Sequence, residues 1–178
     1  MIINPFDIKT ALLAKHAQHV VLIHFPIALF LAAVAFDFLA QRTKNRTVAA
    51  AAYFNLLLAA ISTVPAVATG IAAWQWALEG QKLKGILLMH LVLGGTSSVL
   101  IWIVFLIHWR ARRRGENLRR SYSDLATILD PPDAAHLADM SDSFDLPKYR
   151  FAIEALGMLV VMLTGHLGGF LSGVNGPG

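Results

Sequence analysis

Four stretches of this sequence are apolar for long enough to cross a lipid bilayer. The hydrocarbon core of a bilayer is about 30 Å thick, so a spanning helix needs roughly 20 mostly apolar residues. The four runs cover residues 20–40, 48–76, 85–109 and 151–171. They are continuous rather than alternating, which is not the pattern of a membrane β-barrel. The sequence therefore predicts an all-α membrane protein, a bundle of four transmembrane helices in a single membrane domain over residues 1–178.

The overall composition agrees with a membrane location and removes several redox chemistries. Apolar residues make up 56% of the chain and charged residues only 15%, too few for the surface of a soluble domain. The chain has no cysteine, which excludes an iron–sulfur cluster, a thiolate metal site and c-type haem attachment within it. The first run is too long for a signal-peptide core and carries Asp37 near its far end, so we expect it to remain as a span.

The basic residues predict how the helices cross the membrane. Cytoplasmic loops are enriched in Lys and Arg, and eleven of the fifteen lie in the segments that follow the first and third runs. We therefore expect both termini to lie outside and residues 110–150 to form one long cytoplasmic loop. The arginines of the loop favour contact with anionic lipid rather than with nucleic acid. The eleven residues are Arg42, Lys44, Arg46, Arg110, Arg112, Arg113, Arg114, Arg119, Arg120, Lys148 and Arg150.

Three histidines share one predicted depth in three different spans. His24, His90 and His166 each lie four or five residues inside the predicted outer ends of their helices. At 1.5 Å per residue, this places each imidazole roughly 6 to 8 Å below the outer boundary of the hydrocarbon. Ionisable groups in spans usually face the bundle interior and find partners there. A single such histidine is as often a packing residue as a ligand, but three at matched depth favour a shared cofactor or metal.

Small residues accompany two of these histidines. Gly94 follows His90 by one helical turn, and His166 lies within Gly165, Gly168 and Gly169. Glycines let a flat macrocycle approach the backbone, which would suit haem b. They also allow close helix–helix packing, and the spacing of Gly165 and Gly169 fits that alternative equally well.

Helix order suggests which histidines would be axial ligands. In a bundle wound in chain order the first and third helices are diagonal across the centre, so we expect His24 and His90 to form the axial pair, with His166 as an alternate ligand or hydrogen-bond partner. His19 is about 140° away from His24 on an ideal helix and is expected at the interface. His108 lies five turns beyond His90, about 27 Å away, with no histidine partner at its depth, so we expect at most one haem.

Two carboxylates lie near the predicted inner ends of their spans. Asp37 belongs to the first run and Glu154 to the fourth. A proton relay through intramembrane carboxylates is conceivable. Pairing with a nearby basic residue is the favoured interpretation, and the candidates are Lys44, Arg46 and Arg150.

Several motifs together resemble a known bacterial family. They are HFPIAL at residues 24–29, Asp37 within FDF, ATG at residues 68–70, His90, and GHLGG at residues 165–169. This pattern, over roughly residues 16–173, is similar to the membrane proteins catalogued as domain of unknown function 2231. The resemblance implies a bacterial inner-membrane protein, whose outer side, with both termini, is then periplasmic. It also implies a link to electron-transfer chains, because some members are joined to Rieske-type or cytochrome c-type domains.

Three functions follow from these observations. The leading hypothesis is a haem b-binding electron-transfer subunit that links a quinol to a periplasmic cytochrome, a Rieske-type partner or a larger membrane complex. It would be an electron-transfer or accessory subunit rather than a stand-alone enzyme. The second hypothesis is a non-haem site for copper, zinc or iron formed by His24, His90 and His166. The third is a structural subunit whose histidines only form hydrogen bonds.

Overall fold

The computed structural model describes residues 15–77, 82–126, 147 and 149–171. They form four long helices: α2 over Lys15–Thr43, α3 over Arg46–Ala72, α4 over Gly85–Ala126 and α6 over Arg150–Leu171. A π-helical turn, η1 over Ala73–Ala77, continues directly from α3. The part of the chain that the structure describes contains no strand, which confirms the predicted all-α class.

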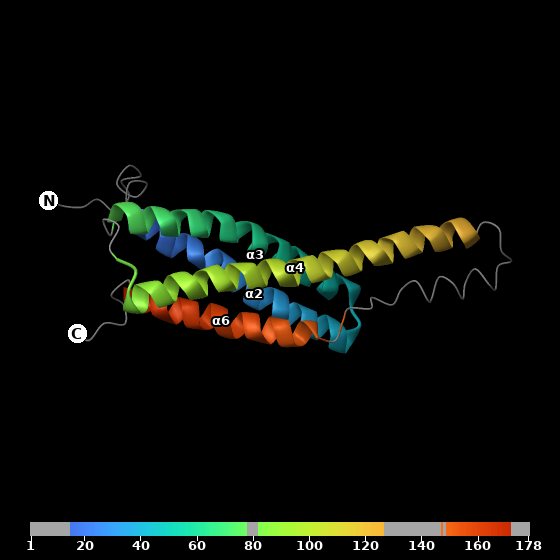
Figure 1. The fold of residues 1–178 in the computed structure, drawn as a ribbon. Helices are drawn as coiled ribbons and strands as arrows, with labels where there is room; N and C mark the ends of the chain where they lie inside the picture. Colours follow the sequence, from blue (N-terminus) through green and yellow to red (C-terminus); the bar gives the residue numbers. More distant parts are fainter. Residues whose placement is uncertain (1–14, 78–81, 127–146, 148, 172–178) are drawn as a thin grey trace, which may run out of the picture.

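The four helices lie side by side as a bundle with two distinct ends (Figure 1). One end, called here the terminal end, contains the first residues of α2 and α4, the turn η1 and the last residues of α6. The opposite end, called the arginine end, contains the junction between α2 and α3, the first turn of α6 and the arginine-rich part of α4. Which membrane face each end contacts stays a prediction.

A tight turn joins α2 to α3 at the arginine end. Lys44 adopts a left-handed backbone conformation with φ of 53°, which reverses the chain after α2. Asn45 then caps α3, because its side-chain oxygen accepts hydrogen bonds from the backbone N–H groups of Thr47 at 2.9 Å and Val48 at 3.2 Å. The cap satisfies two N–H groups that have no partner within the helix. The short connection forces α2 and α3 to be antiparallel neighbours.

The bundle core is made of small and aromatic side chains. Alanines on α3, such as Ala59 and Ala60, are fully buried and allow α2 to approach closely. Phe30 of α2 fills the space against Gly157 of α6. The helices pack most closely as α2 with α3 and α4 with α6, and α3 also packs on α4 and α2 on α6. Helices α2 and α4 are therefore diagonal, as expected. The core cluster consists of Phe30, Ala33, Leu56, Ala59, Ala60, Ile101, Val104, Phe105 and Val161.

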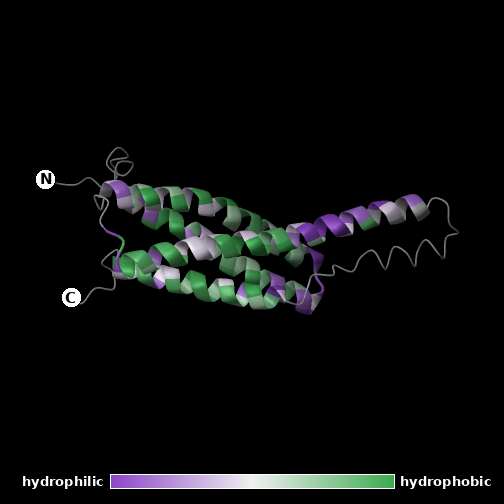
Figure 2. Cartoon of the chain, in the orientation of Figure 1, coloured by the Kyte–Doolittle hydropathy of each residue, from purple (hydrophilic) through white to green (hydrophobic). Residues whose placement is uncertain are grey.

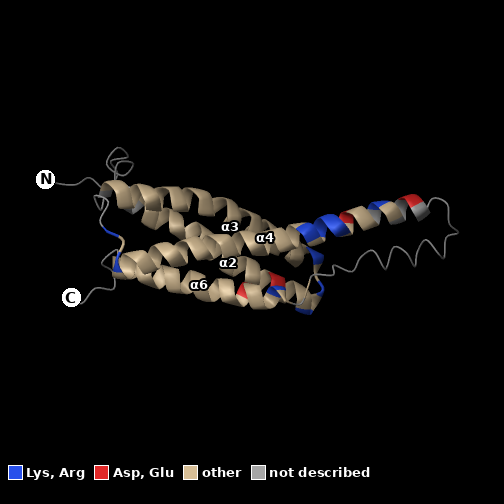
Figure 3. Cartoon of the chain, viewed as in Figure 1, with Lys and Arg blue, Asp and Glu red and all other residues tan. Residues whose placement is uncertain are grey.

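The outer surface of the bundle is apolar, as lipid contact requires. Large side chains such as Phe54, Leu58 and Val64 are more than half exposed. Figure 2 shows hydrophobic residues along all four helices of the bundle, and Figure 3 shows charged residues gathered at the arginine end and on the projecting part of α4. Four segments have the length and hydropathy of membrane spans, which confirms the predicted number. They are Gln18–Thr43, Arg46–Trp76, Gly85–Leu118 and Arg150–Leu171.

Helix α4 continues well beyond the predicted end of the third span. The sequence predicted that the third span would end at residue 109 and that a loop would occupy residues 110–150. Instead, α4 is one helix of 42 residues that continues to Ala126 and projects beyond the other helices (Figure 1). The arginine-rich residues are helix formers, so they extend the span into a polar helix rather than breaking it. Residues 127–146 of the predicted loop lie outside the described part of the chain.

Candidate metal centre

Four ionisable side chains are buried together at the arginine end. Asp37 comes from α2, His108 from α4, and Arg150 and Glu154 from the first two turns of α6. Their exposed fractions are 4%, 7%, 2% and 1%. Because an uncompensated charge inside a bilayer is expensive, such groups persist only when they pair with one another or bind an ion.

Arg150 forms the ion pair of this cluster. Its Nε donates to Asp37 Oδ2 at 3.0 Å and lies 3.9 Å from Glu154 Oε1. Arg150 and Glu154 are four residues apart, so both side chains lie on the same face of α6, which is turned toward α2 and α4. The prediction that Asp37 would pair with a basic residue is confirmed, with Arg150 as the partner. The pair is buried among the helices, at the first turn of α6.

His108 completes the cluster from the opposite side. Its Nε2 lies 3.1 Å from Glu154 Oε1, at hydrogen-bond distance. The second oxygen, Glu154 Oε2, is buried and has no hydrogen-bond partner among the described residues. A buried carboxylate oxygen without a partner costs about 1–3 kcal/mol or more. Binding of a cation or a proton to this oxygen would remove that cost.

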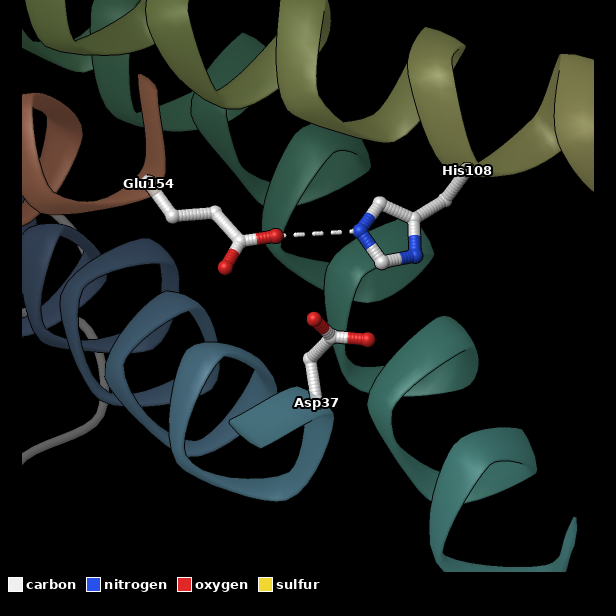
Figure 4. Close-up of side chains that lie close together, drawn as sticks. All are labelled: Asp37, His108 and Glu154. Carbon is white, nitrogen blue, oxygen red and sulfur yellow. Dashed lines mark hydrogen bonds and ion pairs between the residues drawn. The ribbon is translucent and has the colours of Figure 1, made fainter. Parts of the chain in front are cut away.

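The donor atoms of three helices converge closely enough to hold a metal ion. One donor atom each from Asp37, His108 and Glu154 lies within 4.8 Å of the others, and all three residues are buried. Figure 4 shows the three side chains pointing toward one another. Donors bound to one ion at about 2.0–2.2 Å are roughly 3–4 Å apart, so only a small contraction would be needed. The group could therefore hold a metal.

The sequence contained the parts of this cluster without revealing that they meet. The sequence predicts Asp37, Glu154 and His108 at the inner ends of their spans. As a haem ligand His108 has no second histidine at its depth, and that interpretation misses the two carboxylates there. A usable signal was present: three residues with metal-ligating side chains shared one predicted depth on three helices. The rotation of each helix about its axis decides whether such residues meet, and the spacing alone does not supply it.

Two of the three predicted histidine ligands are exposed on the bundle surface. His24 points away from the core, and its Nδ1 lies 2.6 Å from the Val20 carbonyl oxygen of its own helix. His166 is exposed and contacts the edge of the Phe170 ring at 5.1 Å between centroids. The structure therefore does not bring His24, His90 and His166 together as one ligand group.

His90 instead meets His19, a residue that the sequence placed at the interface. The two ring centroids are 6.4 Å apart, with the ring planes at 82°. The half-buried His19 lies on the same face of α2 as the buried Asp37, because the two are 18 residues apart, which is five whole helical turns. The same spacing separates His90 from His108 on α4. Asp37 could have predicted this orientation, since a charged residue in a span faces inward.

The predicted glycines lie in ordinary helix–helix contacts or beside an imidazole, and a slot for a macrocycle stays a prediction. A Cβ at Gly168 would lie 3.2 Å from His90 Cε1, so this glycine makes room for an imidazole. Gly94 faces the methyl group of Thr164 and Gly165 faces Ile27, which are ordinary helix–helix contacts. Gly169 follows Gly165 by one turn on α6.

The fold and this cluster define a multi-pass membrane protein with a buried polar centre. Residues 15–176 match the model of a family described as predicted membrane protein and catalogued as domain of unknown function 2231. The chain belongs to this family, which confirms the resemblance carried by its motifs. No curated protein and no solved structure matches the chain.

Proposed function

We propose that this protein is a membrane-embedded metal-binding protein that holds one transition-metal ion between Asp37, His108 and Glu154. The observation that carries the proposal is the convergence of three buried donor atoms from three helices within 4.8 Å. Glu154 Oε2 adds support, because a buried carboxylate oxygen without a hydrogen-bond partner gains most from a cation.

The donor set indicates which metals would bind. Two carboxylate oxygens and one imidazole nitrogen suit Mn²⁺, Fe²⁺ or Zn²⁺ better than a soft ion such as Cu⁺, which prefers sulfur ligands. His108 would bind through Nε2, the nitrogen that now faces Glu154 at 3.1 Å. Nε2 would have to give up any hydrogen it carries, either as a released proton or by a shift to the tautomer with hydrogen on Nδ1.

Arg150 would position one ligand rather than bind the ion. Its guanidinium holds Asp37 Oδ2 at 3.0 Å and so fixes the orientation of that carboxylate. Its positive charge also offsets one of the two carboxylates. One negative charge then remains in this low-dielectric site, and a metal cation would compensate it. Partners that orient metal ligands in this way commonly contribute about 10–100-fold to metal affinity.

Metal binding by the purified full-length chain tests the proposal directly. The chelator-treated protein in detergent would be titrated with Mn²⁺, Fe²⁺ under anaerobic conditions, and Zn²⁺, with elemental analysis after removal of free metal. We expect one equivalent per chain, and an affinity at least tenfold lower for Glu154→Gln. Glu116→Gln is the matched control, because Glu116 is an exposed carboxylate paired with Arg112 at the same end of the bundle.

Two results would contradict metal binding at this cluster. One is the absence of stoichiometric metal with every ion tested, while far-UV circular dichroism shows a folded helical protein. The other is equal binding by wild type, Glu154→Gln and Glu116→Gln. Either result would leave the cluster as a structural ion-pair network between α2, α4 and α6.

A second candidate function is electron transfer through a haem b at the terminal end, in the bacterial inner membrane, between a quinol and a periplasmic redox partner. It is supported by the pairing of His90 with a second imidazole across the bundle. The function is distinct from metal binding at Asp37, His108 and Glu154, because the two clusters are separated by five turns of α4, about 27 Å. A Soret band with sharp reduced bands in the purified protein would test it.

A further inference from the structure

The pair formed by His19 and His90 spans the diagonal of the bundle. His19 extends from α2 and His90 from α4, and these two helices pack mainly on α3 and α6 rather than on each other. The ring centroids are nevertheless only 6.4 Å apart. Facing side chains in the core of a four-helix bundle are where such folds build cofactor and metal sites.

Each imidazole is held by a carbonyl group of a neighbouring helix. His19 Nδ1 lies 3.1 Å from the Ala66 carbonyl oxygen on α3 and 3.3 Å from Thr69 Oγ1. His90 Nδ1 lies 3.1 Å from the Thr164 carbonyl oxygen on α6. A carbonyl oxygen only accepts, so both Nδ1 atoms carry the hydrogen and donate it.

This hydrogen bonding fixes the tautomer of both rings. When Nδ1 is protonated in a neutral imidazole, Nε2 carries the lone pair and is the nitrogen that binds a metal. Metal-ligating histidines usually donate their other ring N–H to a backbone carbonyl in this way. Two adjacent rings with lone pairs on Nε2 cannot hydrogen-bond to each other through those atoms, whereas both can bind one cation.

Glycines on the helices beside the pair leave room for the rings. A Cβ at Gly70 on α3 would lie 2.9 Å from His19 Cε1, and a Cβ at Gly168 on α6 would lie 3.2 Å from His90 Cε1. Any larger residue at Gly70 would force the His19 ring to move. All four helices thus position the two imidazoles. Helices α2 and α4 carry the histidines, and α3 and α6 provide the carbonyl groups and glycines that the rings contact.

We propose that His19 and His90 form a two-imidazole site for a transition-metal centre, with each ring binding through Nε2. Ligands at about 2.0–2.1 Å on opposite sides of a metal would place the ring centres roughly 6 Å apart, close to the separation of 6.4 Å in the structure. This inference deepens the second candidate function by naming its ligand pair, and it does not depend on metal binding at Asp37, His108 and Glu154.

Charge favours haem iron over a bare ion at this site. Two neutral imidazoles bring no negative charge, so a bare Zn²⁺ would leave two uncompensated positive charges inside the bilayer. The porphyrin dianion cancels the charge of ferrous iron. The same two nitrogens could instead bind a bare metal ion. An absorption spectrum detects haem, and elemental analysis detects a bare ion.

The test uses the full-length protein from a haem-supplemented host, purified in detergent and also titrated with hemin. All proteins carry Glu154→Gln, so metal at the arginine end does not contribute. We expect a Soret band at one haem per chain, at least tenfold weaker hemin binding in His19→Gln and His90→Gln, and no change in His24→Gln or His166→Gln. The last two are matched controls, because their exposed imidazoles lie at the same end.

Two further variants keep the test informative if a histidine substitution prevents folding. Gly70→Ala retains both imidazoles but displaces the His19 ring, so it should weaken haem binding, whereas Gly95→Ala has open space around its Cβ and should not. If the protein binds one equivalent of Cu or Zn and no haem, and both His19→Gln and His90→Gln lose that metal, the site is established with a bare ion as its occupant. The proposal is overturned if neither haem nor metal binds the folded protein, or if His24→Gln weakens binding as much as His19→Gln.

Discussion

The two ends of the bundle hold their ionisable side chains in different ways. At the arginine end, Asp37, Arg150 and Glu154 are almost completely buried and bind one another across two helices. At the terminal end, His19 and His90 are half-buried, and their ring nitrogens lie against backbone carbonyls. Charged groups in a bilayer need partners of opposite charge, whereas the N–H group of a neutral imidazole needs only a nearby acceptor such as a backbone carbonyl.

This difference has consequences for stability. The charge network depends on its one cation, because removal of Arg150 leaves the carboxylates of Asp37 and Glu154 buried and uncompensated. A carbonyl-bound imidazole contributes ordinary hydrogen bonds between neutral groups, and their loss strands no buried charge. Substitutions at the arginine end should therefore affect folding most, and substitutions at the terminal end should affect ligand binding more than folding.

The largest expected effect is that of Arg150→Met. This change keeps the volume but leaves the carboxylates of Asp37 and Glu154 without their cation, so we expect a loss of about 3–5 kcal/mol in the free energy of unfolding. Unfolding in mixed micelles with increasing denaturing detergent, followed by far-UV circular dichroism, measures it.

Arg112→Met is the control for this prediction. Arg112 pairs with Glu116 at 3.1 Å, but its side chain is 39% exposed, so its loss should cost about 1 kcal/mol or less. Equal effects of the two arginine substitutions would show that the buried network is no more important to folding than a surface pair.

A smaller effect is expected in the middle of the bundle, between the two ends. A Cβ at Gly157 would lie 2.8 Å from Phe30 Cζ, and Phe30 is fully buried. Gly157→Ala should therefore lower the free energy of unfolding by about 1–3 kcal/mol through overpacking. In Gly95→Ala the new methyl group meets open space, so stability should be unchanged or slightly higher. The same unfolding assay compares them, and a neutral Gly157→Ala would refute the tight contact.

The smallest expected effect is that of Thr69→Val at the terminal end. The substitution removes the hydroxyl that lies 3.3 Å from His19 Nδ1 but leaves the Ala66 carbonyl at 3.1 Å. We expect a change of about 1 kcal/mol or less in the free energy of unfolding, and hemin binding within twofold of wild type. A loss of hemin binding in a folded Thr69→Val protein would mean that the hydroxyl, rather than the carbonyl, orients His19.

Much of the fold is determined by the sequence alone. Span number and approximate length depend on local hydrophobicity, because a bilayer requires a run of apolar residues of a set length whatever the neighbours are. The diagonal relation of α2 and α4 followed from placing the helices around the bundle in chain order. The pairing of Asp37 with a basic residue also followed, since a buried carboxylate at that depth needs a cation.

The tertiary structure decided which side chains at one depth meet. His19 and His24 differ by about 140° around α2, so the rotation of that helix determines which of them reaches His90. Packing of Phe30, Ala33 and Asp37 against the other helices sets the rotation, and only the assembled bundle contains those contacts. The same rotation brings Asp37 to Arg150 and to the carboxylate of Glu154. Depth in the membrane is a property of the sequence, whereas facing direction is a property of the packed helices.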